Sequence, residues 1–215
     1  MIKALFEMTQ RYLIFCPAAL TACPEFTTLF DLAVACLAEC KGERESTRAT
    51  LNFLSQIIGW RALRLSQAAN VALEAASGTI DACILRQGET MTKACVGALA
   101  GGPQALWSSY SDCLFSIVMH VSSVSATTNG GESIASQWMK TALSDSSVFS
   151  LSKSRSKMTA NTKEAVVHIL LVLANEGPSS KPRAKMLLGD FGRMCQGQAT
   201  AEVLATFSLE EKRNW

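Results

Sequence analysis

Residues 26–58 read FTTLFDLAVACLAECKGERESTRATLNFLSQII, two apolar stripes separated by a short polar turn. In the first half, apolar side chains recur at steps of three and four: Phe26, Leu29, Phe30, Ala33, Val34 and Leu37. In the second half, Leu51, Leu54 and Ile58 form a similar line. This spacing is typical of amphipathic helices with 3.6 residues per turn. Gly42, between the halves, favours the left-handed backbone that ends many helices.

Two such helices form an αα-hairpin, which needs similar neighbours to bury both stripes. Comparable patterns predict further helices at residues 2–15, 66–85, 89–100, 106–121, 132–143, 161–175, 182–196 and 199–207, with a break or bend at Gln87 and Gly88. The pairs recur at about forty residues, the usual length of a HEAT unit. We therefore expect an all-α fold, a HEAT-like α-solenoid of stacked antiparallel helix pairs. It forms one array over residues 1–207, with a flexible Ser/Lys-rich loop at 144–157 and a charged tail at 208–215.

The composition of the 215 residues is that of a globular protein, with 48% hydrophobic and 18% charged residues. The net charge of +2 is too near neutral to indicate direct nucleic-acid binding. The charge is uneven, because residues 151–215 hold 10 Lys and Arg against 6 Asp and Glu. A solvated face also explains such an excess.

The eight cysteines are scattered through apolar helical stretches and show no small disulfide framework. Cys36 and Cys40 stand one helical turn apart, but both histidines, His120 and His168, are far away in sequence. We therefore predict no metal site, and reduced, buried thiols in a cytosolic or nuclear protein. The alternative is a secreted or organellar helical protein whose cysteines pair.

No motif for catalysis or cofactor binding stands out. The chain lacks a phosphate-binding glycine loop and a nucleophile elbow. Asp190-Phe191-Gly192 spells a kinase tripeptide, but the other kinase motifs are missing, so we interpret it as coincidence. We predict a protein that is not an enzyme and has no cofactor. Trp60, Trp107 and Trp138 are expected to lie in the core.

The N-terminal segment has two interpretations. The apolar run at 12–23 has some character of a secretory signal, but Glu7, Gln10 and Arg11 interrupt its approach. The helix at 2–15 is apolar around much of its circumference, which predicts an interior element and a chain that self-associates. No run reaches the length of a membrane span, so no membrane association is expected.

The order of these segments resembles the C-terminal part of nuclear transport receptors of the importin-beta superfamily, closest to the transportin-SR branch. The segments that carry the resemblance are IKALF at 2–6, RYL at 11–13, FDLA at 30–33, REST at 44–47, LNFLSQII at 51–58, ASQWMKTAL at 135–143, and the two closing helices. HEAT motifs are weak patterns, so the similarity is diffuse although it covers nearly the whole chain.

The resemblance implies a HEAT solenoid that binds protein cargo, such as Arg/Ser-rich splicing factors, and shuttles between nucleus and cytoplasm. It implies that Ran GTPase binds only through N-terminal repeats with no counterpart here, so Met1 is expected to start a fragment. The alternative is a generic helical-repeat interaction scaffold. For partner binding we single out six cations of the C-terminal third: Lys153, Arg155, Lys157, Lys181, Arg183 and Lys185.

Overall fold

The computed structural model describes residues 1–39, 43–62, 66–124, 132–149 and 158–211, with side chains up to 207. Every element in these ranges is an α-helix or a short 3₁₀ helix, and none is a β-strand, so the all-α prediction is confirmed. The helices fall into two compact units, Met1–Met91 and Thr92–Trp215, where the sequence predicted one continuous array. The boundary lies inside α6 (Ser77–Gly101).

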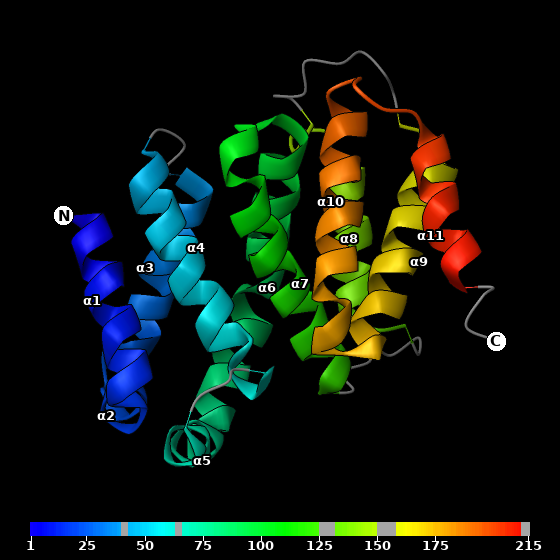
Figure 1. The fold of residues 1–215 in the computed structure, drawn as a ribbon. Coiled ribbons are helices and arrows are strands. Elements are labelled where there is room, and N and C mark those ends of the chain that lie inside the picture. The colour runs from blue at the N-terminus through cyan, green and yellow to red at the C-terminus, as the bar shows by residue number, and fades with distance from the viewer. Residues whose placement is uncertain (40–42, 63–65, 125–131, 150–157, 212–215) are drawn as a thin grey trace. The chain divides into compact units, whose positions relative to one another are not determined.

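The first unit contains the predicted hairpin as α3 (Phe26–Glu39) and α4 (Arg44–Ile58), which pack together (Figure 1). Gly42 lies outside the described residues. α4 also packs along α1 (Ile2–Phe15), so its apolar side chains are buried on two sides. The rings of Phe6 and Phe53 stack between α1 and α4, with centroids 5.6 Å apart. These contacts bury the stripes that the sequence predicted.

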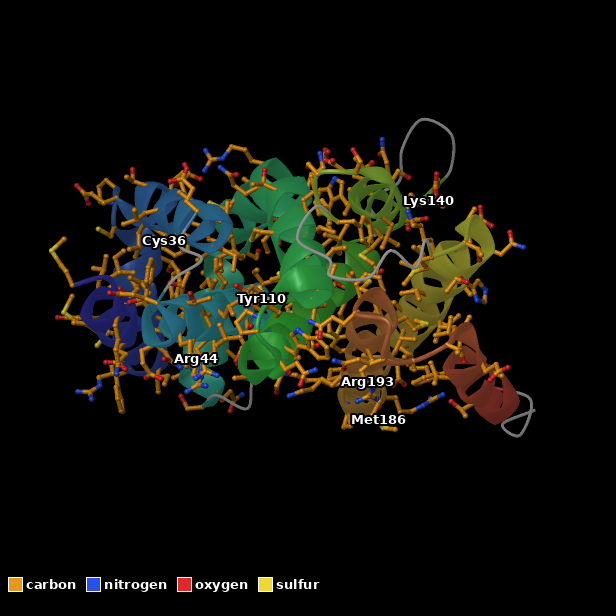
Figure 2. All side chains as sticks on the ribbon, turned by 90° about the horizontal axis from the view of Figure 1, so that it is seen from above. Cys36, Arg44, Tyr110, Lys140, Met186 and Arg193 are labelled. Atoms are coloured by element: carbon orange, nitrogen blue, oxygen red, sulfur yellow. The ribbon has the colours of Figure 1, made fainter. Side chains whose placement is uncertain are left out.

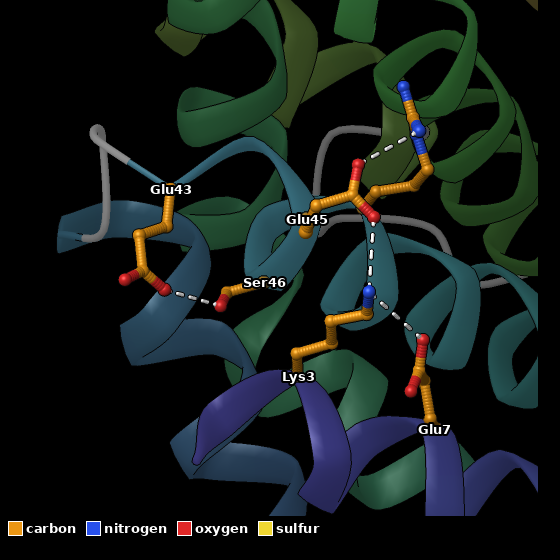
Figure 3. Close-up of polar contacts among 6 residues, drawn as sticks. Lys3, Glu7, Glu43, Glu45 and Ser46 are labelled. Atoms are coloured by element: carbon orange, nitrogen blue, oxygen red, sulfur yellow. Dashed lines mark hydrogen bonds and ion pairs between the residues drawn. The ribbon is translucent and has the colours of Figure 1, made fainter.

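An exposed ionic network ties α1 to α4 at the rim of this interface (Figure 3). Lys3 Nζ lies 3.3 Å from Glu45 Oε2 and 3.8 Å from Glu7 Oε1. Arg48 pairs with the other oxygen of Glu45, also at 3.3 Å. Exposed pairs of this kind stabilise a fold by less than about 1 kcal/mol each, so the network orients α1 more than it stabilises it.

Two short helices complete the first unit. α2 (Pro17–Ala22) follows α1 directly, and it packs against α1, α3 and α5 (Gln67–Ala75). The predicted break at Gln87 and Gly88 is wrong, because α6 runs through both residues and the break lies at Ala76. Arg86 and Gln87 both bond to Asp31 of α3, at 2.7 and 2.9 Å, and these bonds hold the helical turn beside Gly88 in place.

The second unit is organised around α7 (Trp107–Ser123), which packs against α8 (Ile134–Ser144), α9 (Ala160–Glu176) and α10 (Lys181–Cys195). Chain neighbours α8 and α9, and α9 and α10, also pack together. α10 therefore contacts α7 as well as its neighbour in the chain. α11 (Leu204–Glu211) covers α9 and α10, and it extends beyond Phe207 into the predicted tail.

Local signals explain where the helices of the second unit begin and end. Thr159 caps α9, its hydroxyl oxygen accepting a hydrogen bond from the amide of Thr162 at 3.2 Å. Gly177 ends α9 with a φ of 90°, a left-handed value suited to glycine. Gly192 of α10 lies so close to Trp107 that an added Cβ would stand 2.9 Å from the indole ring. A glycine at 192 is thus required for α10 to approach α7.

The three tryptophans predicted for the core are buried, with exposures of 2% for Trp60, 8% for Trp107 and 8% for Trp138. Trp107 and Trp138 belong to the second unit, and Trp60 belongs to the first.

Candidate partner-binding surface

Three of the six predicted partner-binding cations lie at the start of α10, and the other three, Lys153, Arg155 and Lys157, lie outside the described residues. The turn at Gly177 and the 3₁₀ helix Pro178–Ser180 lead the chain into α10. Ser180 is buried and donates its hydroxyl to the carbonyl of Gly177 at 2.8 Å, which fixes this turn. This hydrogen-bonded turn between α9 and α10 sets the position of the cations, and we call it the Ser180 corner.

Lys181 and Lys185 stand one helical turn apart and bracket a single carboxylate, that of Asp112 on α7. Lys181 Nζ lies 3.1 Å from Oδ1, and Lys185 donates a hydrogen bond to Oδ2 at 3.0 Å. The side chains are 44%, 33% and 23% exposed for Lys181, Lys185 and Asp112, so the cluster is at the surface. Each ammonium has three donors, and a single carboxylate cannot satisfy all six.

The third cation of the cluster, Arg183, points to the other side of α10. Its guanidinium donates a hydrogen bond to Glu176 Oε2, at the end of α9, at 2.9 Å. The three described cations lie at a helix start, as the sequence predicted, but the sequence did not show that carboxylates from α7 and α9 already pair with them. A partner has to compete with those carboxylates, which weakens any purely electrostatic attraction.

A second stripe of α10 faces solvent beside these cations. Met186 is 63% exposed, and Arg193, two turns further along, pairs with Asp190 of the same helix (Figure 2). A single exposed apolar side chain is normal on a protein surface, but methionine recurs on surfaces that accommodate varied partners. We call Lys181, Lys185, Met186 and Arg193 the α10 basic surface.

The Asp190-Phe191-Gly192 tripeptide has a structural role in this helix. Asp190 is buried and pairs with Arg193, and Phe191 is 1% exposed. Gly192 provides the close approach to Trp107. These contacts support the interpretation that its kinase-like spelling is coincidental.

The cysteine thiols are the other side chains that could take part in chemistry, and most of those that the structure describes are buried. Cys95 and Cys113 share a hydrogen bond between α6 and α7, and that bond together with burial raises the pKa of Cys95. Burial likewise raises the pKa of Tyr110. Neutral, enclosed thiols are poor nucleophiles. Burial is as predicted for the described thiols other than Cys16 and Cys23, which are exposed.

Two further kinds of site are metal-binding clusters and membrane-spanning helices. No three His, Cys, Asp or Glu side chains in the described ranges gather as metal ligands would, and Cys40 lies outside them. No single helix of the described chain is long and apolar enough to cross a membrane. α5 and α6 reach that length and apolarity only together, across a bend of 64°.

Comparisons with known proteins return no match. No protein-family model, no curated protein and no solved structure matches this chain.

Proposed function

We propose that this chain is a non-catalytic protein-binding module, the C-terminal part of a nuclear import receptor, and that it contributes to cargo binding. The all-α fold, whose helices pack in neighbouring pairs such as α3 with α4, supports the general class of a helical protein-binding module. The proposal takes its specific form from the resemblance of the segments quoted above to the importin-beta superfamily. A HEAT-like solenoid that shuttles between nucleus and cytoplasm is part of this proposal.

The α10 basic surface is the observation that carries the binding role. It combines lysines with unused donors, an exposed methionine and a backbone fixed by the Ser180 corner. An acidic or phosphorylated segment of a cargo protein matches these features. Its anionic groups meet Lys181 and Lys185, and an apolar side chain covers Met186. Exposed charges act mainly on the rate of encounter, so the effect should be kinetic.

Because Lys181 and Lys185 share the carboxylate of Asp112, substitutions of the lysines and of the aspartate should change the association rate in opposite directions. Replacing Lys181 and Lys185 by Gln removes two positive charges, whereas Asp112→Asn removes the negative charge between them. With a phosphorylated Arg-Ser peptide as the probe, stopped-flow association should slow several-fold in the first variant and quicken in the second. Both effects should shrink as salt shortens the screening length to about 8 Å. Arg48→Gln, an exposed pair partner on α4, is the matched control.

The possible results distinguish the proposed import receptor from a generic interaction scaffold. Association rates that move the same way in both variants, or that match the Arg48→Gln control, would overturn the binding role of α10. Binding of any acidic peptide, without preference for phosphorylated Arg-Ser sequences, would favour a generic interaction scaffold. A full-length transcript that encodes many further helix pairs upstream would support the transport receptor.

A further inference from the structure

The first helix has an apolar face that no described residue of the first unit covers. α1 buries Phe6, Thr9 and Leu13, and it packs against α4 and α2. Five other large apolar side chains of this segment are exposed: Met1 at 107%, Phe15 at 77%, Met8 and Tyr12 at 52% each, and Ile14, on another side of the helix, at 40%. Exposed large apolar groups that lie together mark an interaction surface.

These residues form one continuous line with the half-buried Leu5. Their positions, 1, 5, 8, 12 and 15, advance by four, three, four and three residues. That alternation is the heptad spacing of a helix seam that packs against another helix. At 100° per residue the seam lies on a different side of α1 from Phe6, Thr9 and Leu13. We call Met1, Leu5, Met8, Tyr12 and Phe15 the α1 seam.

We propose that the α1 seam binds the α1 seam of a second copy of this chain, in an antiparallel pair with a twofold axis at Met8. The seam has Met8 at its centre and two members on either side, so an antiparallel copy overlaps it completely. Such an isologous contact uses the same residues on both copies and closes after two.

The side chains that this arrangement brings together are complementary in size and chemistry. Leu5, half-buried, faces the larger Tyr12 of the second copy. Met1 faces Phe15, the most exposed aromatic of the seam, and sulfur–aromatic contacts are favourable. Met8 meets its own counterpart. Arg11 is the exposed charge nearest the seam on this helix. Lys3 and Glu7 lie further round, where Lys3 pairs with both Glu7 and Glu45, so these charges do not oppose the contact.

The available area fits a reversible dimer. If a fully exposed large side chain presents roughly 200 Å², the four exposed seam residues present at most about 600 Å² on each copy. A pair would then bury at most about 1,200 Å², which only reaches the lower limit of specific and stable interfaces. The dimer should therefore dissociate in the micromolar range and re-form on mixing.

Charges placed at the twofold axis test this arrangement directly. Met8→Glu and Met8→Lys each place like charges opposite one another, so each variant alone should sediment as a monomer. An equimolar mixture of the two variants places a carboxylate against an ammonium across the axis and should recover a dimer. Ile14→Glu adds the same charge on the same helix but outside the seam, and it should leave the wild-type dimer intact.

The measurement is sedimentation velocity at about 10–100 µM, a range that brackets a micromolar dissociation constant. A reductant is present because Cys16 and Cys23 are exposed. Helix content from circular dichroism confirms that each variant is folded; Met8 is half exposed, so its replacement leaves the core unchanged. A monomeric wild type, a dimer that survives both Met8 variants, or a mixture that stays monomeric would each overturn the proposal. None of these results bears on the α10 basic surface.

Discussion

Gly192 and Gly189 stand in the same helix, and replacement by alanine should stabilise the fold at 189 but not at 192. A Cβ at 192 would lie 2.9 Å from Trp107 Cη2 and 3.0 Å from both Trp107 Cζ2 and the carbonyl oxygen of Leu99. A Cβ at 189 would meet nothing within 4 Å. The two substitutions therefore differ in packing and share the same gain in helix propensity.

The magnitudes follow from these distances. Alanine is favoured over glycine in a helix interior by about 1 kcal/mol, so Gly189→Ala should stabilise the fold by that amount. At 192 the same gain is opposed by overpacking, which costs about 1–3 kcal/mol where a rigid ring and a backbone atom must move. The difference between the two variants should therefore be about 1–3 kcal/mol, with Gly192→Ala the less stable.

Urea unfolding followed by tryptophan fluorescence measures this difference, with an unchanged slope as the sign that only stability has changed. In thermal unfolding the two variants should differ by roughly 2–4 °C for each kcal/mol. Trp107→Phe removes the ring atoms that the new Cβ meets, so Gly192→Ala should cost less in that background. Equal stabilisation by both alanines would refute the close approach of α10 to Trp107.

Three further predictions concern thiols and a helix cap. Cys16 and Cys23 should react with a thiol reagent within minutes in the native protein, and the buried described thiols only on unfolding; rapid labelling of Cys195 would contradict its burial. Burial raises the pKa of Cys195 from 9.0 to about 12, so the unfolded chain loses this proton first, and stability should fall between about pH 9 and 12. In the Cys195→Ala variant the urea midpoint of unfolding should fall less over this pH range. A variant whose pH profile matches that of the wild type would contradict the raised pKa of Cys195. Thr159→Ala removes the hydrogen bond to the Thr162 amide and should cost about 1 kcal/mol, whereas Thr159→Ser should cost little.

Most of the helices could be predicted from local patterns, because the apolar spacing that indicates a helix extends over only a few residues. The stripes of residues 26–39 and 44–58 identify α3 and α4, since each burial pattern repeats along a single helix. The cap of α9 is likewise a local feature, because the partner of the Thr159 hydroxyl, the amide of Thr162, is three residues away. Such features do not depend on the rest of the chain.

Features that depend on distant residues were not predictable. The sequence suggested a break at Gly88, but Asp31, more than fifty residues earlier, holds that turn in helical form. The pairing of Lys185 with Asp112 joins residues 73 positions apart, and nothing in their spacing indicated it. The apolar character of α1 was evident, but only the packing of α4 shows which face remains exposed.

Methyl NMR of the methionines tests the central claim, that the chain binds a protein partner through α10, most directly. Met186 lies on the α10 basic surface and Met8 on the α1 seam, so one spectrum reports on both surfaces. We predict that a phosphorylated Arg-Ser peptide, titrated at constant protein concentration, shifts the Met186 resonance and leaves the Met8 resonance unchanged. An unshifted Met186 resonance at saturating peptide would contradict the proposed function.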